Sequence, residues 1–150
     1  MKLESAAVAM IGLAVIAGVC SLLRAQEPAT RSVWDGVYTT DQAKRGRALY
    51  GQYCASCHGD MLGGGESAPA LVGADFLSNW NGLTLGDLFE RIRVSMPQDK
   101  PGRLSREQNA DILAHMLGVN EFPAGKTELN RDTQVLKQIR IDATKPERNN

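Results

Sequence analysis

The sequence predicts an all-α fold, and three observations support that class. Several stretches of the 150-residue chain repeat apolar residues at spacings of three and four, and each begins at a residue that caps helices. No segment alternates apolar and polar residues as a half-buried strand does, and no internal repeat is present. With 43% hydrophobic and 23% charged residues, the chain has the composition of one small globular domain with flanking segments.

The first 25 residues predict an export signal. Lys2 precedes an apolar run from Ala6 to Leu23, and the chain then becomes polar. Ala25 is a small residue that suits a cleavage site. The apolar run is also close to the length that spans a bilayer, so an uncleaved membrane anchor stays an alternative. Contact with a membrane is expected only if this segment is retained.

Residues 26–40 are expected to form a linker arm. This segment is polar, contains Pro28 and lacks any helical or strand periodicity. Its two large aromatic residues, Trp34 and Tyr38, are the exception. We expect them to pin the arm to the surface of the domain.

The first helix of the domain is predicted to run from Gln42 to Tyr53. Either Thr40 or Asp41 can cap it by accepting hydrogen bonds from its exposed amides. Gly46 lies on the face that carries the apolar residues, although glycine costs helix propensity there. We therefore expect Gly46 to mark a close approach to another helix.

A glycine-rich loop and a short helical turn from Ala74 to Trp80 precede the second strong helix. Thr84 caps this helix, and Asp87 completes an acidic first turn. Pro97 ends the segment just after Met96. The apolar stripe of the helix consists of Leu85, Leu88, Phe89 and Ile92.

The last helix of the domain is predicted to begin at a capping box formed by Ser105 and Gln108, and Gly118 is expected to close it. The domain therefore covers residues 41–119, and residues 120–150 form a C-terminal extension. The buried side of the last helix is expected to consist of Ile112, Leu113, Met116 and Leu117.

The most informative motif is the Cys-x-x-Cys-His sequence at residues 54–58. This pattern attaches a c-type haem: the thiols of Cys54 and Cys57 bond the porphyrin, and the imidazole of His58 becomes one axial ligand of the iron. A zinc site is an alternative, but outside the leader these three residues and His115 are the only cysteines and histidines that could form it. A thioredoxin-like dithiol would need a βαβ context that the sequence lacks.

The second axial ligand is expected to be Met96. It follows a capped helix and precedes a proline, so its backbone is held out of helical geometry and can turn inward. Met61 is too close to His58 in sequence to reach the opposite face of the haem. Met116 lies on the apolar side of a helix, where methionine usually fills a core. His115 neighbours the same buried stripe and is a less favoured candidate.

Together these segments resemble a class I monohaem c-type cytochrome. The resemblance covers about Asp41 to Leu117 and rests on Gly46 and Tyr50, the Cys-x-x-Cys-His motif, Pro69-Ala70-Leu71-Val72-Gly73, Met96-Pro97 and the final helix. The stretch from Met96 to Ser105 is also similar to bacterial cytochromes associated with periplasmic quinoprotein dehydrogenases. His115 departs from the pattern, because an aromatic residue is common at that position.

The resemblance implies a cytochrome c fold, a small helical domain wrapped around one covalently attached haem c. Its iron ligands would be His58 and Met96, and the backbone carbonyl of Pro69 would orient the imidazole. Trp80 is a candidate to donate a hydrogen bond from its indole to a haem propionate, since an indole N–H suits a carboxylate.

The expected function is one-electron transfer between periplasmic or otherwise exported redox partners, with a quinoprotein dehydrogenase or a terminal oxidase among the candidates. No residue is assigned a catalytic role. Without residues 1–25 the net charge is about −1, which argues against nucleic acid as a partner. Two alternatives stay open: a haem subunit of a dehydrogenase complex, and a peroxidase-like enzyme or sensor whose distal ligand dissociates.

Overall fold

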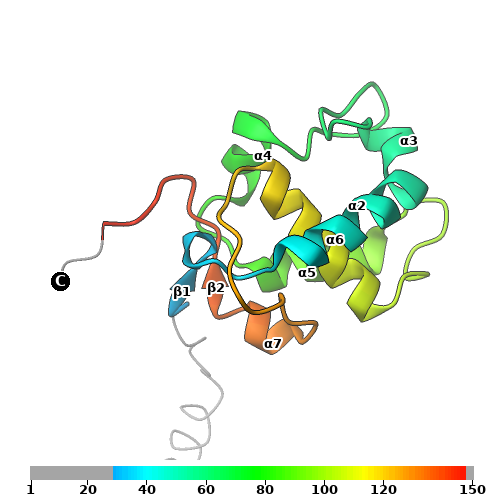
Figure 1. Ribbon diagram of the computed structural model, residues 1–150. Helices are drawn as coiled ribbons and strands as arrows, with labels where there is room; N and C mark the ends of the chain where they lie inside the picture. The colour runs from blue at the N-terminus through cyan, green and yellow to red at the C-terminus, as the bar shows by residue number, and fades with distance from the viewer. Residues whose placement is uncertain (1–28, 148–150) are drawn as a thin grey trace, which may run out of the picture.

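The computed structural model describes residues 29–147, so the predicted export signal at residues 1–25 lies outside the described part. The secondary structure is almost entirely helical (Figure 1), and the predicted all-α class is confirmed. None of the helices between residues 29 and 147 has the length and apolar character that crossing a bilayer requires. In chain order the elements are β1 (Arg31–Ser32), the 3₁₀ helix η2 (Val33–Asp35), α2 (Thr40–Tyr53), α3 (Ala55–His58), α4 (Gly73–Trp80), α5 (Leu85–Ser95), α6 (Arg106–Val119), α7 (Thr133–Leu136) and β2 (Ile139–Arg140).

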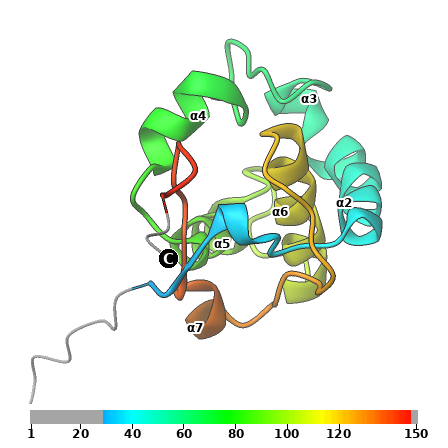
Figure 2. The ribbon, with the colours of Figure 1, turned by 60° about the vertical axis from the view of Figure 1, so that its left-hand side comes forward.

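Helices α2 and α6 lie side by side and cross closely at Gly46 (Figures 1 and 2). A β-carbon built on Gly46 would lie 1.8 Å from the carbonyl oxygen of Asp111 on α6, so only glycine fits at this crossing. The predicted close approach is confirmed. Next to it, the guanidinium of Arg45 binds both carboxylate oxygens of Asp111 at 3.0 Å, which raises the pKa of Arg45.

The caps of the helices follow the predictions with two corrections. The capping boxes Thr84/Asp87 and Ser105/Gln108 are both present. However, α2 begins at Thr40, two residues earlier than predicted, because the hydroxyl of Thr39, one residue before the predicted cap candidates, accepts a hydrogen bond from the N–H of Gln42. Helix α6 continues through Gly118 to Val119, and Asn120 caps it instead.

The predicted linker arm is pinned to the domain as expected. Trp34 donates its indole N–H to the carbonyl of Asp142 at 2.9 Å, and the hydroxyl of Tyr38 donates to the carbonyl of Phe122 at 2.7 Å. Strand β1 of this arm pairs in parallel with β2, a two-stranded pairing that the sequence analysis did not predict (Figure 1). The residues that the arm contacts, Asp142, Phe122 and those of β2, all lie in the C-terminal segment.

The C-terminal segment is part of the core in its described range, residues 120–147. The side chain of Gln42 on α2 bonds both the amide and the carbonyl of Leu129. A β-carbon on Gly86 of α5 would lie 2.5 Å from the side chain of Lys137, so α7 packs directly on α5. Five apolar side chains of this segment are buried: Phe122, Leu129, Leu136, Ile139 and Ile141. Residues 120–147 therefore follow the predicted domain in the sequence but belong to its core in the fold.

Candidate haem-binding site

The Cys-x-x-Cys-His motif forms a helical corner at the end of α2. Cys54 caps α2 by donating its backbone N–H to the carbonyl of Tyr50, and α3 then begins at Ala55. The thiol of Cys54 is half-buried and that of Cys57 is exposed, and both are free. Burial raises the pKa of Cys54 to about 11, so this group is a neutral thiol near pH 7.

His58 is only 8% exposed, and its ring is held in one orientation. The Nδ1 atom lies 2.8 Å from the carbonyl oxygen of Pro69. Because a carbonyl oxygen only accepts hydrogen bonds, the ring donates from Nδ1, and in the neutral imidazole Nε2 then keeps its lone pair. This is the form of the imidazole that binds a metal.

A glycine in the loop after the motif allows Pro69 to reach His58. Gly64 has a φ of 75°, and a β-carbon on it would lie 2.7 Å from the carbonyl carbon of Pro69 and 2.5 Å from the nitrogen of Ala70. Its own N–H donates to the carbonyl of His58 at 2.8 Å. The glycines here predict a loop, but nothing in the sequence distinguishes Gly64 from its neighbours Gly63 and Gly65.

The corner is also tied to α2 by a tyrosine. The hydroxyl of Tyr50 donates to the carbonyl of Gly59 at 2.7 Å, directly after His58. Burial, with smaller contributions from Cys54 and Asp60, raises the pKa of Tyr50 to about 12, so the hydroxyl stays protonated and able to donate.

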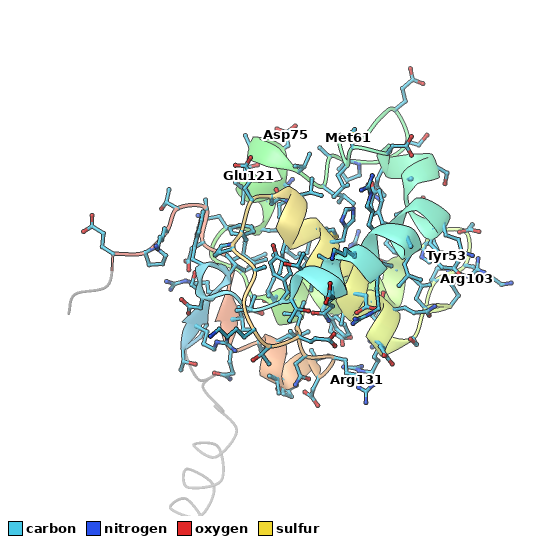
Figure 3. All side chains as sticks on the ribbon, viewed as in Figure 1. Tyr53, Met61, Asp75, Arg103, Glu121 and Arg131 are labelled. Carbon is cyan, nitrogen blue, oxygen red and sulfur yellow. The ribbon has the colours of Figure 1, made fainter. Side chains whose placement is uncertain are left out.

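The three methionines considered as ligands occupy different environments. Met96 follows α5, is half-buried and has an extended backbone with φ −123° and ψ 153°. Met61 is 80% exposed and lies at the outer edge of the molecule (Figure 3). Met116 is 2% exposed within the core, as predicted for a core residue. Met96 alone of the three combines partial burial with a backbone outside a helix.

Trp80 ends helix α4 and packs against the hydrophobic core. Within residues 29–147 its indole N–H has no hydrogen-bond partner, whereas that of Trp34 is engaged by Asp142. The guanidinium of Arg93 on α5 is held by the carboxylate of Glu90 at 2.7 to 3.1 Å.

His115 packs on the ring of Tyr50, with the centroids 5.5 Å apart and the planes at 60°. Burial, together with the charge of Arg47, lowers the pKa of His115. In the described part of the chain, no group of three or more His, Cys, Asp or Glu residues is arranged to hold a metal ion. The environment of His115 is that of a packed side chain.

The donor set fits haem c. Two free thiols three residues apart, an imidazole with Nε2 left available and a half-buried thioether are the groups that a covalently bound haem with two axial ligands requires. A small helical domain with this motif and a carbonyl-oriented histidine is the architecture of a monohaem c-type cytochrome.

Comparisons with known proteins agree with this class. The family model described as "Cytochrome C oxidase, cbb3-type, subunit III" matches residues 41–116, about half of the chain. The chain belongs to this family; its cofactor is haem c with iron, and its role is haem-based electron transfer.

One solved structure is also similar to the chain. It is the crystal structure of the sulfane dehydrogenase SoxCD from Paracoccus pantotrophus, with 24% sequence identity and a TM-score of 0.46. The similarity covers 71% of this chain and 61% of that chain, so the present sequence spans under two thirds of the length of its neighbour. No curated protein matches the chain.

Proposed function

We propose that the protein is a one-electron carrier in which His58 and Met96 are the two axial ligands of the haem iron. When bound, haem c supplies an iron that gains and loses one electron. The chain contributes an imidazole on one side and a thioether on the other, a combination that raises the reduction potential relative to two imidazoles. Because both ligands stay in place, no coordination position opens to a substrate.

The remaining site residues would hold and orient the cofactor. Cys54 and Cys57 form the two thioether bonds, and the carbonyl of Pro69 fixes the ring of His58 and increases its donor strength. Trp80 donates its free indole N–H to a propionate. The observation that carries the proposal is the 2.8 Å hydrogen bond between Nδ1 of His58 and the carbonyl of Pro69, because it leaves Nε2 as the ring nitrogen available to a metal.

Electron transfer is proposed to take place outside the cytoplasm, after export directed by residues 1–25. The candidate partners are a quinoprotein dehydrogenase and a terminal oxidase. A haem subunit of a dehydrogenase complex is the second candidate function.

The experiment that tests the ligand assignment compares the wild-type holoprotein with Met96→Ala. Ferric wild-type protein is expected to show the weak absorption band at the red end of the spectrum that reports sulfur-to-iron bonding, and ferrous wild-type protein is expected to resist carbon monoxide at neutral pH. The variant should lose the band and bind carbon monoxide. A band that persists in the variant rejects Met96, and rapid binding of carbon monoxide by the wild type favours the peroxidase-like enzyme or sensor.

A further inference from the structure

We propose that Arg103 and Tyr53 form a clasp that holds the loop of residues 96–104 against the end of α2 and so keeps Met96 on the iron. The two residues would be positioning residues for the distal ligand. The inference rests on the proposed function, because it assumes that Met96 is that ligand.

The clasp is a contact between a cation and an aromatic face. The guanidinium carbon of Arg103 lies 4.8 Å from the centroid of the Tyr53 ring, and the two side chains lie together at one edge of the molecule (Figure 3). A separation below about 6 Å is the range in which a guanidinium is attracted to a ring. No ion pair within residues 29–147 competes for Arg103.

The contact joins the two parts of the chain that carry the proposed iron ligands. Tyr53 is the last residue of α2 and immediately precedes Cys54. Arg103 lies in the loop that begins at Met96, after α5. Because Tyr53 is covalently adjacent to the attachment motif, the clasp connects the distal loop to the part of the chain that would be bonded to the haem.

Apart from this contact, the hydrogen bonds and buried side chains that hold the loop within residues 29–147 lie at its two ends. At one end, Met96 donates its N–H to the carbonyl of Ile92 at 2.9 Å. At the other, the side chain of Leu104 is buried, and its carbonyl accepts from the amide of Asn109 at 3.3 Å. These two anchors leave residues 97–103 between them.

Within residues 97–103 the other hydrogen bonds are internal to the loop. Lys100 donates to the carbonyl of Pro97, and Arg103 donates to that of Lys100. In the described part of the chain, the contact with Tyr53 is therefore the one hydrogen-bond, ion-pair or ring contact that ties residues 97–103 to the rest of the molecule. Its loss should increase the fraction of time that the loop is open.

Carbon monoxide binding measures that fraction. A sixth ligand has to leave before carbon monoxide enters, so with rapid opening and closing the observed rate scales with the opening equilibrium. A cation–π contact at an exposed site shifts an equilibrium by about two- to fivefold. The rate of carbon monoxide binding should rise by the same factor when the clasp is removed.

The test uses dithionite-reduced holoprotein mixed with carbon monoxide in a stopped-flow instrument. Arg103→Ala and Tyr53→Leu should each bind about two- to fivefold faster than the wild type, and the double variant should be no faster than either single variant, because both remove the same contact. Tyr53→Phe keeps the ring, and Arg131→Ala removes an exposed arginine at another edge (Figure 3); both should behave as the wild type.

Unchanged rates in Arg103→Ala and Tyr53→Leu would overturn the clasp, as would effects that add in the double variant. A drop in thermal stability without a change in rate would also overturn it, because that is what a purely structural contact gives. If the ferric wild type lacks the sulfur-to-iron band, the ligand assignment fails first. If the band is present and the rates do not change, only the clasp fails.

Discussion

Replacing Gly46 with alanine tests the crossing of α2 and α6, on which the position of the attachment motif depends. The added β-carbon would lie 1.8 Å from the carbonyl oxygen of Asp111, whereas real β-carbons keep at least 3.0 Å, so the helices would have to separate by 1.2 Å or more. A gap of about 0.5–1 Å already forfeits a quarter to a half of the dispersion attraction across an interface. We therefore expect a loss near the upper end of the overpacking range, about 3 kcal/mol.

The assay is thermal unfolding of the holoprotein, with Gly51→Ala as the matched control. Gly51 lies on the same helix, but a β-carbon there meets nothing within 4 Å. Each kcal/mol shifts the Tm of a domain of this size by roughly 4 °C, so Gly46→Ala should lower the Tm by roughly 12 °C. Gly51→Ala should raise it slightly, because alanine is the better helix former. Equal stability of Gly46→Ala and the wild type would refute the argument.

Three further substitutions test other parts of the structure. Gly64→Ala should displace the carbonyl of Pro69 and weaken the donor strength of the imidazole, so the reduction potential measured by spectroelectrochemistry should rise. Gly63→Ala, where a β-carbon has free space, should leave the potential unchanged. Equal potentials in the two variants would contradict the role of Gly64 in positioning Pro69. Leu136→Ala should lower the free energy of unfolding, measured by chemical denaturation, by about 2–5 kcal/mol, because it opens a cavity in the core. The control Val135→Ala, on the exposed side of α7, should lower it only slightly. A loss in Leu136→Ala no larger than that of the control would show that α7 does not stabilise the domain. Because the pKa of His115 is lowered in the folded state, its contribution to stability is complete above pH 6.5 and is lost as the pH falls through the folded-state pKa. The free energy of unfolding measured across this range should show that dependence in the wild type and not in His115→Phe. Identical pH profiles of the two proteins would exclude His115 as its source.

The two capping boxes and the attachment motif could be predicted because they depend on residues that are close in sequence. Thr84 and Asp87, for example, are three residues apart and form the predicted capping box. The thiols and imidazole of the Cys-x-x-Cys-His motif are likewise adjacent along the chain. Gly46 was also predictable, because a glycine on an apolar helix face has few explanations other than a close crossing.

The contacts that sequence reasoning missed join residues that are far apart in the chain. The two-residue strands pair Arg31 with Ile139, which is too short a match to leave any alternating pattern. Gln42 accepts and donates across to Leu129, and a buried glutamine on a helix carries no sequence signal of its partner. The ring contact between Arg103 and Tyr53 also joins distant parts of the chain. It was missed because an arginine in a loop is usually a solvated charge and indicates no particular partner.

The most direct test of the central proposal is the intact mass of the mature protein in denaturing solvent, followed by peptide mapping. The proposed attachment predicts a gain equal to one haem, located on the peptide that contains Cys54 and Cys57, with neither thiol free to react. A folded protein whose mass is that of the polypeptide alone, and whose two thiols both react with an alkylating reagent, would contradict it.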